Sequence, residues 1–516
     1  MEVDLRVQRR RRNRLLVLIV AATPVIAGAG CQGCDDVNVQ VVGLDAGADG
    51  PTTEVAGVGG SGAGGAGTGG AGTGGTGTGG VGAGAGGGLG GAGAGGAGLG
   101  GAGSGGRGTG GIVTGGTGGG AALAITAVYS HNDHTCALSS AGTVRCWGYN
   151  VAGQLGYGNT NNNVGVISTP ASAGDVDVGG KVTQLALGTL HTCALLDNGH
   201  VRCWGDSMYG QLGHGNKNRI GDNETPASAG DVDIGGLVTQ LAAGDSYTCA
   251  LLANGHVRCW GLDTVGTLGY ATAGVMIGDD ETPASSGDVD LGGTVVQLAA
   301  GQWHTCAVLQ GGAVRCWGRN NGAGNLGYGN EEHVGDNETP ASAGDVDIGG
   351  VAIGIAVGAA HSCAVLQGGA VRCWGSGPAL GYGNNNVIGD DESPSSAGDV
   401  PVGGAVLGLA AANRHTCALL QGGAVRCWGQ GLQGQLGYGN TDAIGDNEPA
   451  SAAGSVNIGG TVTQIAAGTF HSCAVLSGGT VRCWGTGTQG GLGYVNNGAV
   501  IGDNETPASA GDVIVY

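Results

Sequence analysis

The sequence predicts an all-β protein, a seven-bladed β-propeller of four-stranded antiparallel blades. The first observation is a hairpin motif, HTCALLDNGHVRCWG at His191 to Gly205, which recurs seven times. The second is the spacing of the copies, 54 to 57 residues, a period that indicates propeller blades in a chain of short β-prone segments. The third is the pair of cysteines in every copy, always ten residues apart.

Each hairpin is predicted to carry a disulfide. In the second copy, Thr192 to Leu196 and His200 to Trp204 are β-prone segments joined by Asp197-Asn198-Gly199, a three-residue loop with glycine at its positive-φ position. This loop length places the two cysteines opposite one another, about 4.5–5.5 Å apart at Cα, within the span of a disulfide. Buried free thiols are the alternative. The predicted pairs are Cys136–Cys146, Cys193–Cys203, Cys249–Cys259, Cys306–Cys316, Cys363–Cys373, Cys417–Cys427 and Cys473–Cys483.

The remaining strands of a blade flank the hairpin. In the second copy the first strand is predicted at Val182 to Leu187 and the fourth within Gly230 to Ile234. The first unit starts at Ala124-Ile125-Thr126 with no Ala-Ser-Ala-Gly-Asp-Val segment before it, and the chain ends with a spare one, Ala508 to Tyr516. We therefore expect this terminal segment to supply a missing strand at the ring joint and to lock the first unit to the last.

Residues 1–30 are predicted to be a lipoprotein-type signal peptide. A basic stretch precedes the apolar residues Leu15 to Ala27, which are too few to span a bilayer as a mature helix. Gly28-Ala29-Gly30-Cys31 resembles a bacterial lipobox, in which Cys31 would be acylated, although Gly28 stands where that motif usually has Leu. A simple secreted protein and an uncleaved anchor are the alternatives. We expect an exported protein at the bacterial outer membrane or cell surface, or otherwise secreted.

Residues 31–121 are predicted to be a disordered tether rich in Gly, Ala and Thr. Residues 61–120 contain 36 glycines, and such a chain buries too little apolar surface to offset the entropy of ordering it. The propeller is expected to occupy residues 122–516.

The formal net charge of −20 restricts the partners of the propeller. Nucleic acids and anionic membranes are recognised through Lys and Arg, so an acidic surface argues against both. We expect a protein or a cell-surface ligand as partner, contact with membrane only through the N-terminal lipid, and a monomeric chain without a cofactor.

The repeated motifs resemble a known family. These are His-Thr/Ser-Cys-Ala-Leu/Val-Leu, Gly-x-Val-Arg-Cys-Trp-Gly, Gly-Gln-Leu-Gly-Tyr-Gly at Gly434 to Gly439, and Gly-Asp-x-Glu-x-Pro. Over residues 122–516 they are similar to the regulator of chromosome condensation repeat family, which implies a seven-bladed propeller. The eukaryotic namesake exchanges nucleotide on a small nuclear GTPase, a partner that an exported chain would not meet. A secreted bacterial relative binds and inhibits β-lactamase. The resemblance therefore implies binding without chemistry.

Three repeated side chains are assigned structural roles. The histidines would be spread around a sevenfold axis, so they are predicted to form hydrogen bonds at the start of the second strand and not to bind a metal; they are His134, His191, His304, His361, His415 and His471, with Tyr247 in the third copy. The arginines are predicted to pair with aspartates of the Gly-Asp turns; they are Arg145, Arg202, Arg258, Arg315, Arg372, Arg426 and Arg482. The tryptophans are predicted to pack between blades; they are Trp147, Trp204, Trp260, Trp317, Trp374, Trp428 and Trp484.

The acidic turns leave two alternatives open. Segments such as Asp222-Asn223-Glu224 offer oxygen ligands for calcium, although no EF-hand spacing is present and a solvated turn is the simpler interpretation. Paired carboxylates could also serve a secreted hydrolase or lyase acting on polysaccharide. An active site should interrupt the repeat, whereas these acids occur in nearly every copy. We therefore predict no catalytic residue, and a purely structural surface protein is a further alternative.

The turns that differ between copies indicate the binding surface. The turn between the first and second strands and the loop after the third strand vary, whereas the other two connections scarcely change. In an antiparallel meander both variable sets leave from one face of the disc. We hypothesise that this face, with Leu190, Trp303, Arg414 and Phe470, is the contact surface, since aromatic residues and Arg are enriched at binding hot spots. Drift in unused loops is the alternative.

Overall fold

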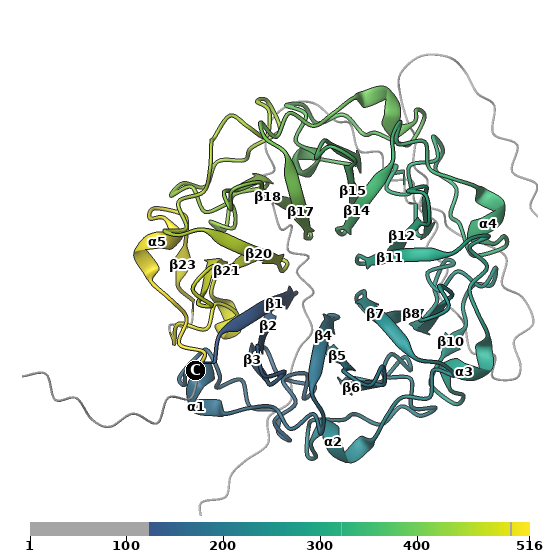
Figure 1. Ribbon diagram of the computed structural model, residues 1–516, viewed down its shortest axis with the longest axis vertical. Helices are drawn as coiled ribbons and strands as arrows, with labels where there is room; N and C mark the ends of the chain where they lie inside the picture. The colour runs from purple at the N-terminus through teal and green to yellow at the C-terminus, as the bar shows by residue number, and fades with distance from the viewer. Residues whose placement is uncertain (1–122, 321, 496–497) are drawn as a thin grey trace, which may run out of the picture. The chain divides into compact units, whose positions relative to one another are not determined.

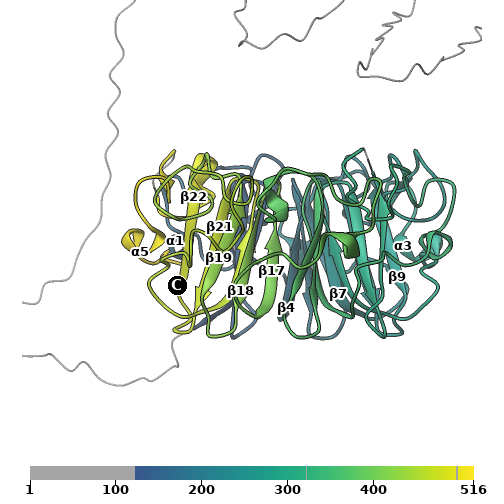
Figure 2. The ribbon, with the colours of Figure 1, turned by 90° about the horizontal axis from the view of Figure 1, so that it is seen from above.

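The computed structural model describes residues 123–320, 322–495 and 498–516. The predicted signal peptide, Cys31 and the predicted tether lie outside these residues. Seven antiparallel sheets are arranged radially around a central axis, as Figure 1 shows, and Figure 2 shows the resulting disc from the side. The predicted seven-bladed propeller is confirmed.

Each blade contains three strands in meander order, and the third and seventh blades have a short fourth strand. The first three blades comprise β1 (Ile125–His131), β2 (His134–Ser139) and β3 (Val144–Gly148); β4 (Val182–Leu187), β5 (His191–Leu196) and β6 (Val201–Gly205); and β7 (Val238–Ala243), β8 (Tyr247–Leu252), β9 (Val257–Leu262) and β10 (Met276–Ile277). The fourth and fifth comprise β11 (Val295–Ala300), β12 (His304–Leu309) and β13 (Val314–Gly318), and β14 (Ala352–Val357), β15 (His361–Leu366) and β16 (Val371–Gly375). The last two comprise β17 (Val406–Ala411), β18 (His415–Leu420) and β19 (Val425–Gly429), and β20 (Val462–Ala467), β21 (His471–Leu476), β22 (Val481–Thr486) and β23 (Val500–Ile501).

Single helical turns follow the third strands, and α1 to α5 lie on the outer rim (Figure 1). They are α1 (Pro170–Ala173), α2 (Pro226–Ala229), α3 (Pro283–Ser286), α4 (Pro340–Ala343), η1 (Pro378–Leu380), η2 (Pro394–Ala397), η3 (Thr488–Gly490) and α5 (Pro507–Ala510). Seven of these eight turns begin with proline, whose fixed φ and missing N–H suit the first helical position.

The hairpin register is the predicted one. In the second blade Leu195 lies opposite Val201 and Cys193 opposite Cys203; the second strand ends at Leu196 as predicted, and the other three strand limits differ from the predicted ones by one residue. All seven predicted disulfides are present, with Cα–Cα separations of 4.0–4.1 Å. Because all fourteen half-cystines are buried, each bridge closes its hairpin inside the blade.

The prediction of a fourth strand within Gly230 to Ile234 is wrong. This segment makes one ladder bond, from the Val232 N–H to the Val201 oxygen. The helical turn α2 and the positive φ of Gly230 direct the chain away from the direction of β6, so this segment forms no continuous strand beside it. The fourth pairing occurs earlier in the chain instead, as β10, as β23, or as a bridge such as that between Gly205 and Ile220.

The ring joint also differs from the prediction. The terminal segment is not a missing strand of the first blade, because Val513 bridges to Val481 of the seventh blade's own β22. Each hairpin is followed by its own Pro-containing segment, so every blade is one continuous piece of chain. The segment still joins the last blade to the first, because the Val515 oxygen accepts a hydrogen bond from the Arg145 guanidinium.

The predicted hydrogen-bonding role of the histidines is confirmed, and the partners form a closed ring. Each buried histidine Nε2 lies 2.8–3.1 Å from the Thr or Ser hydroxyl at the second position of the next blade's second strand. His471 of the seventh blade reaches Thr135 of the first, which closes the circle. In the third blade the Tyr247 hydroxyl makes the equivalent contact with Thr305 at 2.9 Å.

The hydroxyls in this ring fix the histidine tautomer. The Thr192 hydroxyl donates its single proton to the main-chain carbonyl oxygen of Gln154. The His134 Nε2–H must therefore be the donor in the hydrogen bond to Thr192. The same Gln154 oxygen accepts the indole N–H of Trp204 at 2.9 Å. Five of the seven joints contain this Trp contact, which confirms the predicted packing of the tryptophans between blades; all seven indoles are fully buried.

The arginines connect blades on the outer side. In six blades the Nε–H donates to an Asp at 2.7–3.0 Å, as Arg202 does to Asp231, so the predicted pairing is confirmed there. The same guanidinium donates through NH1 to a carbonyl of the preceding blade, in this case that of Val178. The sixth blade has Ser455 at the aspartate position, and the buried Arg426 Nε–H has no partner among the described residues.

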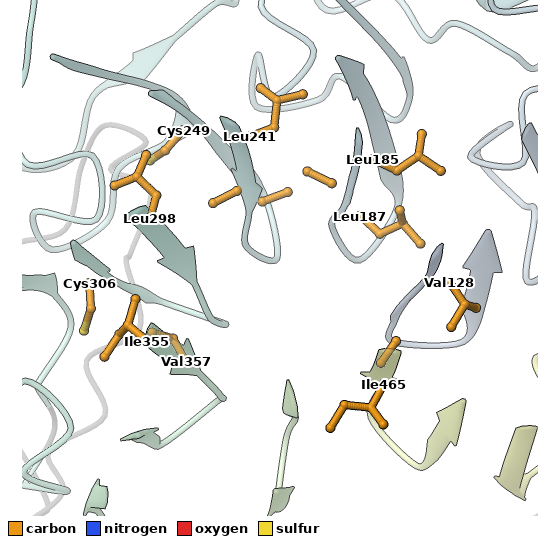
Figure 3. Close-up of a cluster of buried hydrophobic side chains, with 14 of the residues drawn as sticks. Val128, Leu185, Leu187, Leu241, Cys249, Leu298, Cys306, Ile355, Val357 and Ile465 are labelled. Atoms are coloured by element: carbon orange, nitrogen blue, oxygen red, sulfur yellow. The ribbon is translucent and has the colours of Figure 1, made fainter. Parts of the chain in front are cut away.

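Aliphatic side chains of the innermost strands fill the space between the blades. Leu185, Leu241, Leu298 and Ile355 occupy the same position in consecutive blades and are buried, as Figure 3 shows. The core is therefore a ring of equivalent contacts between neighbouring blades, each burying the same kind of surface.

The histidine ring predicts acid sensitivity. Burial lowers the pKa of His191, His304 and His415 to about 3 and that of His361 and His471 to about 4. An unfolded histidine titrates near pH 6.5. Between about pH 6.5 and pH 4 the unfolded state therefore binds more protons, and the free energy of unfolding should fall with decreasing pH by about 1 kcal/mol per pH unit per histidine.

Tyr247→His provides the test, because it adds a seventh buried imidazole facing Thr305. We expect a steeper loss of stability between pH 6.5 and 4.5 than in the parent chain, measured by guanidinium unfolding at several pH values. The difference at pH 8, where histidines are neutral in both states, serves as the control for altered packing. Parallel pH profiles in the two proteins would contradict the prediction.

The sixth blade offers a gain of stability. Ser455→Asp should give Arg426 the carboxylate that the other six arginines have and raise the free energy of unfolding by about 1 kcal/mol, since the pair is partly exposed. Asn457→Asp adds the same charge two residues away and should give no such gain. Equal melting temperatures for the two variants would show that the ion pair contributes nothing.

Candidate functional site

The two variable sets of connections lie on one face of the disc. In every blade a backbone N–H at the end of the third strand donates to the carbonyl of the turn between the first two strands, at 2.8–3.1 Å. Examples are the bonds from Tyr149 to Asp133 and from Asp206 to Leu190. The same bond joins Arg319 to Trp303. We call this side, formed by these turns and the loops after the third strands, the variable face.

All four predicted binding residues are on this face, but not in one patch. Leu190 and Trp303 are half-buried, whereas Arg414 and Phe470 are exposed. They belong to the second, fourth, sixth and seventh blades, so only Arg414 and Phe470 come from neighbouring blades. The main-chain oxygen of each residue accepts the hydrogen bond described above, which positions the turn and leaves the side chains free to vary.

Sequence reasoning missed a set of exposed apolar residues in the long loops. Leu432, Met208 and Val151 are 72%, 55% and 40% exposed, and Phe470 is 40% exposed. These four residues lie on the consecutive blades six, seven, one and two, and we call them the apolar arc. Leu432, Met208 and Val151 each follow the motif tryptophan by four residues, a regularity that could have identified them in the sequence.

A cavity of about 530 Å³ occupies the centre of the ring. The innermost strands line it, and turn residues form its rim on the variable face. The rim departs from the repeat at one place, where His131 Nε2 lies 3.2 Å from the Asp245 carboxylate and the Thr189 hydroxyl donates to the same oxygen at 2.9 Å. Burial raises the pKa of Asp245, but hydrogen bonding to His131 and its charge outweigh burial, so that the net pKa is lowered.

This cavity gives the polysaccharide-hydrolase alternative no support. Asp245 is the only carboxylate among the described residues that line it, whereas a glycosidase needs a pair about 5–10 Å apart. Three carboxylates do lie together in each of two outer turns, Asp279-Asp280-Glu281 and Asp390-Asp391-Glu392. Burial, a hydrogen bond from protonated Glu392 to Asp391 and the charges of Asp390 and Asp391 raise the pKa of Glu392 to about 7, yet both turns lie outside the cavity.

The repeat itself matches a known family. One model of the regulator of chromosome condensation (RCC1) repeat matches seven times, at residues 125–154, 182–211, 238–267, 295–324, 352–386, 408–435 and 462–490. A second RCC1 repeat model matches residues 141–195, 198–251 and 422–475. The chain belongs to the RCC1 repeat family. The seven matches coincide with the seven blades.

Relatives with RCC1 repeats include proteins of very different size. The chain is 30% identical to the ultraviolet-B receptor UVR8 of Arabidopsis thaliana over 365 residues, which is 70% of this chain and 76% of the receptor. It is 27% identical to the E3 ubiquitin-protein ligase HERC2 of Homo sapiens over 66% of this chain, but this spans only 7% of the ligase. Prp20p of Saccharomyces cerevisiae has the same fold, with a TM-score of 0.54 at 21% identity, covering 74% of this chain and 87% of Prp20p.

Two features bear on localisation. Seven disulfides are compatible with an extracellular location, since they persist in oxidising compartments. Within residues 123–516, as far as the structure describes them, no helix has the length and apolar character needed to cross a bilayer.

Proposed function

We propose that this RCC1-repeat propeller is a non-enzymatic binding protein, tethered to the bacterial surface, that recognises a protein or another extracellular ligand through its variable face. The observation that carries the proposal is the apolar arc. Leu432, Phe470, Val151 and Met208 are exposed on consecutive blades of a face whose loops differ from blade to blade. Exposed apolar residues gathered on one face are typical of interaction sites.

The arrangement favours a protein partner. Aromatic and Arg side chains carry a large share of the energy at protein interfaces, and Arg414 lies one blade from Phe470. Leu190 and Trp303 are proposed to extend the contact to the second and fourth blades. The net charge of −20 would steer a cationic surface towards the disc.

The relatives support binding as the common activity. The crystal structure of Prp20p is described together with its binding to Gsp1p and histones, so an RCC1 propeller serves there as a binding surface. Neither nucleotide exchange nor ubiquitin ligation is proposed for this chain. The ligase activity of HERC2 belongs to a protein of which this chain spans 7%.

The surface location rests on the N-terminal sequence. We propose that Cys31 is acylated and that residues 31–121 act as a tether for the propeller, with secretion after cleavage as the alternative. Cys31→Ala should move the protein from the membrane fraction to the soluble periplasmic or culture fraction, measured by fractionation and immunoblotting. The unchanged protein in the same cells is the control, and an identical distribution of both would refute the anchor.

Binding through the variable face predicts a separation of binding from stability. Phe470→Ala combined with Leu432→Ala should lower the affinity for a partner identified by cross-linking at least tenfold, because truncated hot-spot residues typically cost 2 kcal/mol or more. The melting temperature should change by less than a few degrees, since both side chains are exposed. Affinity is measured by surface plasmon resonance.

The matched control is Leu237→Ala on the opposite face. Leu237 is an exposed leucine that precedes β7, away from the variable face, and its loss should leave the affinity unchanged. The same series with Trp303→Ala and Arg414→Ala tests how far the contact extends. Unchanged affinity in the double variant, or an equal loss with Leu237→Ala, would rule out the variable face as the binding surface.

A further inference from the structure

The loop after the third strand of the third blade contains a buried carboxylate without a side-chain partner. Asp263 is completely buried, and its carboxylate faces the backbone N–H groups of Gly266, Thr267 and Leu268 but has no side-chain partner within the described part of the chain. The hydroxyl of Thr267, four residues on, is likewise buried and without a partner. A buried ionised carboxylate left in this state is costly, so something absent from the chain itself is expected to satisfy it.

Other blades show what this position normally does. Asn150 and Asn320 occupy it in the first and fourth blades, and each donates its side-chain amide to two carbonyls of its own loop at 2.8–3.2 Å. Ser207 in the second blade donates its hydroxyl to the Asn216 oxygen. In these three blades the position supplies a donor, which an ionised Asp263 lacks, and the asparagine Oδ1 also accepts a backbone N–H; the other three blades have glycine there.

A second carboxylate approaches from the next blade. The backbone of Asp336 packs directly on Gly266, whose missing Cβ would lie 2.3 Å from the Asp336 nitrogen. The buried Oδ1 of Asp336 also has no partner among the described residues. Burial raises the pKa of Asp263 to about 7 despite nearby backbone N–H groups, and the charge of Asp336 adds to this increase.

The chain provides no positive charge here, although it does so one blade earlier. In the second blade's loop, Arg219 pairs with Asp206 at 3.0 Å and Lys217 pairs with Asp279 at 3.1 Å. Residues 262–277 of the third blade contain no Lys, Arg or His. This loop therefore offers Asp263 no basic side chain of its own, and a cation at this position would have to come from solution.

We propose that Asp263, Thr267 and Asp336 form a site for a hard divalent cation, with Ca²⁺ as the ion. The donors are carboxylate and hydroxyl oxygens only, which Ca²⁺ prefers and soft metals do not. A cation at this position would take over the function of the asparagine amide in the first and fourth blades, linking Asp263 to the loop. It would also link the third blade to Asp336 of the fourth.

Calorimetric titration of the full-length, disulfide-bonded chain with CaCl2 at constant ionic strength tests the site. We expect Asp263→Asn to remove one equivalent of bound Ca²⁺, or to weaken that equivalent at least tenfold, while the fold is retained because the variant recreates the side chain found at Asn150 and Asn320. Asp336→Asn should have the same effect. Asp222→Asn is the matched control, since Asp222 packs on Gly153 as Asp336 packs on Gly266, but beside an Asn150 loop.

A proton is the competing occupant. If the carboxyl of Asp263 were simply protonated, wild-type stability would rise between pH 8 and pH 6 relative to Asp263→Asn, and 5 mM CaCl2 would leave the melting temperature unchanged. That result overturns the proposal. Equal Ca²⁺ stoichiometry and affinity in the wild type and Asp263→Asn overturn it as well, whereas a Ca²⁺-dependent rise of melting temperature confined to chains with Asp263 supports it.

Discussion

Every joint of the ring depends on a shared hydrogen-bonding node between neighbouring blades. At six of the seven joints a loop carbonyl of one blade accepts a Thr or Ser hydroxyl of the next blade, and at five joints it also accepts that blade's Trp indole N–H. The histidine of the blade that provides the carbonyl completes the node. All these groups are buried, so each node must be fully satisfied or incur a desolvation cost. This requirement explains why His, Thr or Ser, and Trp recur while the residues around them change.

The node also explains which departures from the repeat the fold tolerates. Tyr247 replaces histidine because its hydroxyl reaches both Thr305 and the His304 oxygen, although the buried Trp317 indole nitrogen at this joint has no partner among the described residues. Ser455 leaves Arg426 Nε without its carboxylate, but that contact lies on the outer side and is partly exposed. Asp263 is different, since a buried donor position has become an acceptor, and this makes the third blade chemically distinct from the others.

Local patterns predicted the fold well and the connections poorly. The loop of three residues ending in Gly199 determined the hairpin register, and facing cysteines then followed from geometry alone. The fourth strand could not be located in this way, because Val232 and Ile234 have a strand-like pattern while Pro226 and Gly230 bend the chain that leads to them. Three members of the apolar arc, Leu432, Val151 and Met208, were missed because their position four residues after the motif tryptophan does not show that they are exposed, which only the structure reveals. The contrast at position 263 likewise depends on the structure, because the loop carbonyls that accept the Asn150 and Asn320 amides cannot be identified from the sequence.

The ring joint between the seventh and first blades has the same construction as the other six. Leu123 and Tyr516 line the same small depression there, and the Arg145 contact to Val515 repeats the contact of Arg202 to Val178. Among the described residues no sheet combines strands of the first and seventh blades, so the order in which the polypeptide visits the blades is not dictated by the fold. Circular permutation, with the native ends fused and new ends opened at a turn such as Gly235-Gly236, would keep every sheet intact and would allow the polypeptide to enter the disc beside any chosen blade.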